Sequence, residues 1–412
     1  MGDIMADNKH FFKDNLYLLI GTGVINLTGF LFHFYMGRTL GPESYGVLAT
    51  LIALTALMGI LATTFQFSIS KFVTLLHLKK QTERLRYLYS DYTKKMIYGT
   101  IIAFVLLLIV NIFLSSYLRI PYYLLFISIL AILVVPELSI VRGFLQGLQH
   151  FRTYGMNLAV EGTTKLIAGI LLVILGYSVG GALVAIILSY ALATIYGIRK
   201  IKTYIQGTKE SFPLREIYKY TLPMFVTVLF FTAFYSLDLF LIKHFFPAID
   251  AGHYAVISLI GKIVFFASFS IVQVMFPKVV ELSEQGGAHK SLMWKSAGII
   301  GIITVPIILG YHFFGTFVVQ LLFGSAYLSV TPLIVPYGIF MATISFSKLF
   351  SLYLLSLKKY TFLYLFAFFL ALELILIYLY HDTLAQVVTL LQGVGAILFI
   401  ALFFIVWRVK NE

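Results

Sequence analysis

Six ionisable side chains lie inside long apolar stretches of the sequence, where an unpaired charge is costly. They are Glu161, Lys165, Asp238, Lys262, Lys348 and Glu373. A charged side chain at the centre of a membrane helix costs about 2.5–3.5 kcal/mol on insertion scales. Six such charges facing lipid would cost roughly 15–20 kcal/mol, more than the ~5–15 kcal/mol by which whole proteins are stable. These side chains must therefore face a protein interior or a water-filled cavity, where they can bind a charged substrate or carry a proton.

Spacing suggests partners for some of these charges. Glu161 and Lys165 are four residues apart, the distance at which side chains meet on a helix. They form either a structural ion pair or a site in which Lys165 receives an anionic substrate group. Asp238 and Lys262 lie on successive apolar stretches and could pair across them. Glu161 and Asp238 are also candidates for coupling to an ion, because buried carboxylates can titrate near neutrality.

A third candidate site follows the fourth apolar stretch, in the segment RGFLQGLQ at 142–149. Gly143 and Gly147 form a GxxxG pair, which lets helices approach closely. Arg142 and Gln146 are four residues apart and share a helix face, and a guanidinium can hold phosphate in a bidentate fork. The alternative is a packing motif beside an ordinary flanking arginine.

The elements that position these residues are membrane helices. The chain is 60% hydrophobic and 11% charged, with a mean hydropathy of +0.96. A membrane helix needs about 20 apolar residues, and about twelve stretches of that length predict an all-α polytopic membrane protein. The predicted spans are 15–36, 45–69, 96–117, 121–141, 155–176, 179–198, 219–245, 253–277, 297–319, 329–356, 360–380 and 384–407.

The net charge of +13 follows from topology and does not indicate a nucleic-acid partner. Nearly all of the 30 Lys and Arg residues lie in alternate turns, and such turns are the cytoplasmic ones. The exceptions are Arg38, Arg119 and Lys243 on the opposite side, and Lys165, Lys262 and Lys348 within spans. We therefore expect a multi-pass protein of the cell membrane with both termini in the cytoplasm.

A basic cytoplasmic linker at 199–218 divides the predicted spans into two lobes of six, 1–198 and 219–412. A short repeat supports the division, because YGVLA at 45–49 and YAVIS at 254–258 each open a span after an outside turn. The lobes would be parallel repeats about a pseudo-twofold axis along the membrane normal, and transporters of this kind bind substrate between them. Between the second and third spans, leucines recur among basic residues at 70–95, which predicts an amphipathic surface helix.

Signals of enzyme chemistry are missing from the sequence. There is no cysteine, no GxxxxGK[ST] loop for a nucleotide, and no histidine spacing typical of metal ligands. We therefore expect neither catalytic residues nor a metal or cofactor, and a protein that is not an enzyme.

Two segments resemble a known family. FYMGRTLGPESYGVLA at 34–49 is similar to the first outside turn of polysaccharide-biosynthesis flippases, the Wzx-like branch of the multidrug/oligosaccharidyl-lipid/polysaccharide exporter superfamily. RGFLQGLQ at 142–149 resembles the segment after the fourth span in the same superfamily, and Glu161 and Asp238 lie where its members often carry acids. The resemblance implies a V-shaped, two-lobe transporter that moves a polyprenyl-(pyro)phosphate-linked oligosaccharide to the outer leaflet by alternating access.

The resemblance also implies partners and a site. The partners would be the lipid-linked oligosaccharide, membrane lipids and glycan-assembly enzymes. A phosphate-bearing substrate needs a cationic cavity, for which the substrate-binding candidates are Lys165, Arg142, Lys262, Arg38, Lys348 and Gln146. The chain departs from the lipid-linked peptidoglycan-precursor flippases in having about twelve predicted spans where fourteen are expected there.

Two other functions stay open from the sequence. A cation-coupled multidrug or small-molecule exporter of the same superfamily would have a cavity dominated by acids, whereas three of the buried residues here are lysines. A membrane glycan polymerase or ligase would need a sizeable outside loop with catalytic residues, and the outside turns here are short.

Overall fold

The computed structural model describes residues 2–213, 225–226, 228–268, 289–357 and 359–409, together with residues 271, 272, 275, 279 and 282. Throughout these residues the secondary structure is helical, with no strand, which confirms the predicted all-α class. Parts of the predicted linker 199–218 and of the predicted spans 219–245 and 253–277 lie outside the described residues. The division into lobes at this linker stays a prediction.

The described helices include ten segments long and apolar enough to cross a membrane. Two of them, Ile20–Leu78 with 59 residues and Phe151–Ile205 with 55, are each far too long for one crossing. At about 1.5 Å per residue, 59 residues would reach ~90 Å, against a hydrocarbon core of ~30 Å. The backbone breaks inside both segments, at Gly41 (φ 73°, ψ 172°) and at Gly176 (φ 91°). Each long segment therefore holds two spans, and about twelve spans result, as predicted.

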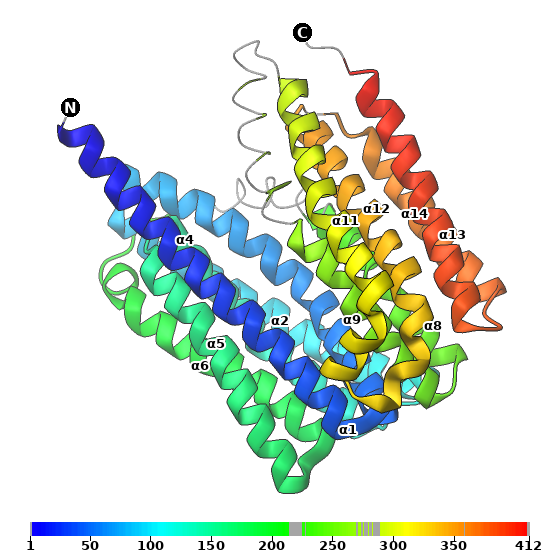
Figure 1. Cartoon of the computed structure of the whole chain (residues 1–412). Coiled ribbons are helices and arrows are strands. Elements are labelled where there is room, and N and C mark those ends of the chain that lie inside the picture. The colour runs from blue at the N-terminus through cyan, green and yellow to red at the C-terminus, as the bar shows by residue number, and fades with distance from the viewer. Residues whose placement is uncertain are drawn as a thin grey trace. The chain divides into compact units, whose positions relative to one another are not determined.

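The chain forms two compact units. Unit 1 contains Met1–Leu40 and Val47–Thr232, and unit 2 contains Gly41–Gly46 and Ala233–Glu412. The helices of unit 1 are α1 (Gly2–Leu78), α2 (Thr82–Leu118), α3 (Tyr122–Leu130), the 3-10 turn η1 (Ala131–Leu133), α4 (Val135–Gly147), α5 (Phe151–Leu172), the π-helical turn η2 (Val173–Tyr177) and α6 (Ser178–Ile205). Those of unit 2 are α8 (Leu237–Phe245), α9 (Ala248–Ala267), α11 (His289–Leu322), the 3-10 turn η3 (Ser325–Val330), α12 (Thr331–Ser356), α13 (Thr361–Leu379) and α14 (Leu384–Trp407) (Figure 1).

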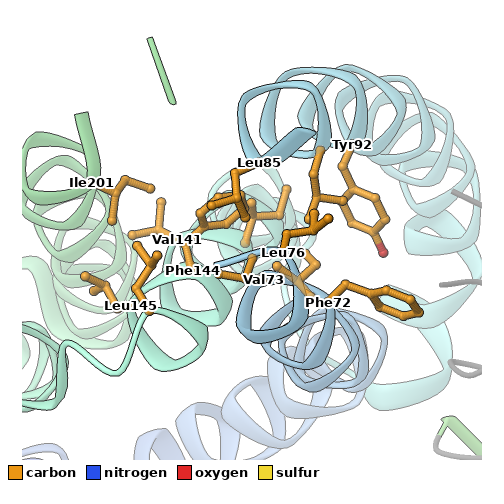
Figure 2. Close-up of a cluster of buried hydrophobic side chains, with 13 residues drawn as sticks. Phe72, Val73, Leu76, Leu85, Tyr92, Val141, Phe144, Leu145 and Ile201 are labelled. Atoms are coloured by element: carbon orange, nitrogen blue, oxygen red, sulfur yellow. The ribbon is translucent and has the colours of Figure 1, made fainter. Parts of the chain in front are cut away.

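The end of α1, the start of α2, and α4 enclose a hydrophobic core in unit 1 (Figure 2). Phe144 and Val141 of α4 are buried there, and Leu85 and Leu88 of α2 are fully buried as well. The predicted amphipathic surface helix at 70–95 is therefore wrong. α1 continues to Leu78 and α2 begins at Thr82, so the basic turn between them is short and its leucines belong partly to the core.

Two small residues allow α4 to lie close to α1. A Cβ atom on Gly143 would come within 2.9 Å of the carbonyl oxygen of Gln66, and one on Gly147 within 2.6 Å of that of Ser70. Such distances leave no room for a side chain, so the GxxxG pair serves close helix packing. The Thr74 hydroxyl also donates to the Gly147 carbonyl at 2.9 Å.

In unit 2, α12 is central and packs against α9, α11 and α14, while α13 lies against α14 (Figure 1). The Gly41–Gly46 turn belongs to this unit although it interrupts α1. Tyr45 is fully buried, with its ring centroid 5.9 Å from that of Phe323 and 6.4 Å from that of Tyr327. Gly46 lies against Gly252 of α9, where a Cβ atom would meet the Gly252 backbone nitrogen at 2.7 Å.

Candidate functional site

A buried polar cluster joins α4 and α5 in unit 1. Arg142 donates from Nη2 to Glu161 Oε2 at 2.5 Å and from Nε to Asn157 Oδ1 at 2.8 Å. The side chains of Arg142 and Glu161 are only 13% and 9% exposed. Asn157 in turn donates from Nδ2 to the Ala193 carbonyl of α6 at 2.6 Å. The cluster therefore ties three helices together, α4 to α5 through charge-assisted hydrogen bonds and α5 to α6 through a neutral one.

This cluster changes two of the expected pairings. Glu161 forms its ion pair with Arg142, so the direct i, i+4 ion pair with Lys165 is wrong, although the charges of Glu161 and Lys165 interact. The planar guanidinium donates to the Glu161 carboxylate from Nη2 and to the Asn157 amide from Nε at the same time, a geometry that a lysine ammonium does not offer. Arg142 also does not share a network with Gln146, whose Oε1 lies 3.4 Å from Nε2 of Gln66. The same amide nitrogen of Gln66 donates to the Tyr154 hydroxyl at 3.0 Å.

Lys165 lies in the middle of α5 and is half-buried. Its Nζ atom is 5.7 Å from the ring centroid of Phe32, within cation–π range. Gly29, one turn earlier on α1, has no side chain there, and a Cβ atom on it would lie 3.6 Å from Nζ. The ammonium group of Lys165 therefore lies over an aromatic face, beside a glycine that leaves room for it.

A second buried cluster surrounds Asp238 in unit 2. Its Oδ2 accepts hydrogen bonds from the hydroxyls of Tyr254 at 2.6 Å and Tyr337 at 2.9 Å. Its Oδ1 accepts from the backbone N–H of Leu239 at 2.9 Å. Asp238 is fully buried and lies in the first turn of α8, where the helix dipole favours a negative charge. Ser258 Oγ completes the group, 3.1 Å from the Tyr337 hydroxyl.

Glu373 on α13 is the second acid of this region. It is 1% exposed, and within the described part of the chain neither of its carboxyl oxygens has a hydrogen-bond partner. Its charge interacts with that of Asp238. A buried carboxylate with no partner is costly, so this group is stable as the neutral acid or beside a bound cation.

The two membrane lysines of unit 2 also lie over aromatic rings. Lys262 Nζ is 5.7 Å from the ring centroid of Tyr235, and Lys348 Nζ is 4.8 Å from that of Phe265. No ion pair joins Lys262 to Asp238, although their charges interact, and two tyrosines donate to the Oδ2 atom of Asp238.

Sequence reasoning missed both tyrosines of the Asp238 cluster. Tyr254, Ser258 and Lys262 are spaced four residues apart on α9, so a helical plot of this span would have placed them on one face. Tyr337 carries no such signal, because it lies 99 residues from Asp238 in sequence.

Arg38 is exposed on α1, shortly before the Gly41 break. Within the part of the chain that the structure describes, no group of three or more His, Cys, Asp or Glu side chains could hold a metal ion.

A chain that is helical throughout its described residues, with about twelve apolar spans, a buried ion pair and membrane lysines, is a multi-pass membrane protein. The chain belongs to the family described as polysaccharide biosynthesis protein, whose sequence model matches residues 11–283. It is 24% identical over 336 residues to an uncharacterized membrane protein of Methanocaldococcus jannaschii, covering 74% of this chain and 77% of the relative.

Solved structures share the fold. An inward-facing multidrug resistance MATE family transporter of the MOP superfamily superposes with a TM-score of 0.78 at 12% identity, covering 95% of this chain and 98% of that one. The lipid II flippase MurJ, in an inward closed conformation, superposes with a TM-score of 0.72 at 14% identity, covering 96% of this chain and 88% of that one. The chain therefore shares the fold of these two transporters.

Proposed function

We propose that this protein is a flippase that moves a polyprenyl-(pyro)phosphate-linked oligosaccharide from the cytoplasmic to the outer leaflet of the cell membrane, by alternating access. The observation that carries the proposal is the environment of Lys165, Lys262 and Lys348. Each of these membrane lysines lies over an aromatic ring. An aromatic face attracts a cation, and a lysine ammonium is a ligand for phosphate groups, so these three positions are the candidates for binding the phosphates of the substrate.

The family supports the same function. The family is described as polysaccharide biosynthesis protein, and a glycan attached to a lipid phosphate or pyrophosphate would bring an anionic group into the membrane. Arg142 has a different role in this proposal. Because its guanidinium is bound to Glu161 and Asn157, it positions α4 against α5, and Lys165 is the first phosphate ligand. Arg38 and Gln146 remain candidates for contact with the glycan.

The coupling site of the proposal is Asp238 with Glu373. A proton or a monovalent cation between the two buried carboxyl groups would relieve the cost of burying Glu373 without a hydrogen-bond partner. Tyr254 and Tyr337 hold Asp238 in place. Glu161 is a weaker coupling candidate, because its charge is neutralised by Arg142.

A cation-coupled exporter of drugs or other small molecules is the second candidate. The buried acids Asp238 and Glu373 favour it, since a cationic drug needs a negative site. The substrate charge separates the two functions, because the lysines would repel a cation that the acids attract.

The test is transbilayer movement of a labelled lipid-pyrophosphate oligosaccharide in proteoliposomes. We expect movement with the wild type and loss of it with Lys165→Ala. Lys200→Ala is the matched control, because Lys200 Nζ also lies 5.7 Å from an aromatic ring centroid, that of Tyr196, but at the end of α6. The control variant should transport normally. Transport of organic cations in place of the glycolipid would overturn the proposal in favour of an exporter.

The remaining parts of the proposal follow from the substrate. Both termini and the basic turns would lie in the cytoplasm, where glycan-assembly enzymes supply the substrate. Protease protection of a tag at either end in sealed inside-out vesicles tests this orientation, and protection of both tags would refute it.

A further inference from the structure

A recess opens on the surface of unit 1 between α2 and the break that separates α3 from α4. It is lined by four residues of α2 between Met96 and Ile101, and by Leu133, Pro136 and Glu137. None of these residues belongs to the two buried clusters described above.

The recess exists because the helix of the fourth span is interrupted. Pro136 has no N–H to donate to the preceding turn, and its ring crowds the carbonyl one turn earlier. The chain responds with the 3-10 turn Ala131–Leu133, in which the N–H of Val134 donates to the Ala131 carbonyl at 3.0 Å. Regular helix resumes at Val135, and the irregular stretch leaves a hollow beside α2.

The walls of the recess are apolar and face the bilayer. Ile97 and Ile101 are each 50% exposed and Leu133 is 45% exposed, all within membrane-spanning segments. Exposed apolar side chains at this depth contact acyl chains, so the neighbour available to fill the recess is a lipid.

One end of the recess is polar. Glu137 Oε1 accepts a hydrogen bond from the Tyr89 hydroxyl at 2.6 Å, and a carboxylate has room for several more donors. Lys94 is exposed and lies three residues before Ile97 and seven before Ile101, so it shares their face of α2. Leu133 lies four residues, about one helical turn, before Glu137 in the chain, and both line the recess. The recess therefore has an acceptor, Glu137, in its lining, and a cation, Lys94, lies outside the lining on the same face of α2 as Ile97 and Ile101.

We propose that this recess binds a phospholipid with a primary ammonium headgroup, of the phosphatidylethanolamine type. The ammonium donates to Glu137, the phosphate lies beside Lys94, and one acyl chain follows Ile97, Ile101 and Leu133. A choline headgroup does not fit as well, because its quaternary nitrogen has no N–H to donate to the carboxylate. The site does not depend on the function proposed above.

The test measures lipid retained by the purified full-length protein, by native mass spectrometry, after exposure to phosphatidylethanolamine, phosphatidylcholine or phosphatidylglycerol with the same acyl chains. We expect the wild type to prefer phosphatidylethanolamine over phosphatidylcholine by about tenfold, the effect of one charge-assisted hydrogen bond. Glu137→Gln should abolish this preference. Equal retention of the two lipids by the wild type, or stronger retention of phosphatidylglycerol, would overturn the proposal.

Two matched variants separate the site from general lipid binding. Lys94→Gln should lower retention of every phospholipid. Lys95 pairs with Asp91 and lies off this face of α2, so Lys95→Gln should leave retention unchanged. Ile101→Trp is the alternative test if Glu137→Gln fails to fold. Its indole ring would fill the recess from an exposed position, so lipid retention should fall while the melting temperature stays unchanged. Equal effects of the two lysine variants, or full retention by Ile101→Trp, would refute the assignment.

Discussion

The Arg142–Glu161 pair allows a quantitative test of what holds α4 against α5. Glu161→Ala leaves the guanidinium of Arg142 in a site where its side chain is 13% exposed, with Asn157 as its remaining hydrogen-bond partner. Removing one partner of a buried pair costs about 3–5 kcal/mol, because the other charge stays buried without compensation. At ~2–4 °C per kcal/mol, the melting temperature should fall by roughly 6–20 °C.

The chain contains a matched control for this experiment. Arg84 and Glu210 are also joined at 2.5 Å, but their side chains are 35% and 49% exposed. Water screens such a pair, so Glu210→Ala should cost less than about 1 kcal/mol. The comparison holds the distance constant and changes the burial.

A double variant tests the reasoning itself. Arg142→Met with Glu161→Leu removes both charges, and apolar replacement of a buried pair is often neutral or stabilising. We therefore expect the double variant to melt well above Glu161→Ala when both are followed by thermal unfolding in detergent. If the double variant is as unstable as the sum of the single variants, or if Glu161→Ala and Glu210→Ala melt together, desolvation of the unpaired charge is not the cause.

Three further predictions concern single positions. Gly252→Ala should prevent stable folding of unit 2, because its methyl group would collide with the backbone carbonyl of Pro42. Expression level and melting temperature test this, and a melting temperature equal to that of the wild type would contradict it. Tyr337→Phe removes one of the two hydroxyl donors to Asp238 and should cost about 1–3 kcal/mol, measured by thermal unfolding; an unchanged stability would show that the bond contributes nothing. Burial and a second histidine nearby lower the pKa of His150 from 6.5, so the folded state binds fewer protons than the unfolded state and stability falls as the pH drops through 6.5. His150→Gln should make the melting temperature depend less on pH between pH 5 and 8. An unchanged pH dependence would refute this role of His150.

Much of the fold follows from local sequence. About twelve spans were predictable because each needs only a sufficient run of apolar residues. The break at Gly41 falls in a predicted turn, and the break at Gly176 falls on the last residue of a predicted span. The close approach at Gly143 and Gly147 was predictable for the same reason, because the GxxxG spacing is local. The amphipathic pattern at 70–95 misled because leucines among basic residues fit a membrane surface and a buried helix end equally well.

The partners of the buried charges were not predictable in this way. Spacing identifies the residues that share a helix face, but not the helix that packs against that face. Glu161 therefore pairs with Arg142, 19 residues earlier on the neighbouring α4, and not with Lys165 one turn later.

By itself the sequence determined that this protein crosses the membrane many times, that its basic residues alternate between turns, and that six ionisable side chains need protection from lipid. These conclusions depend on the energy of transferring each side chain into hydrocarbon, which is a property of the residue and its near neighbours. Only the tertiary structure decided that Tyr254 and Tyr337 hold Asp238, and that the Gly41–Gly46 turn belongs to unit 2. Such contacts join residues far apart in the chain, so they depend on the packing of whole helices.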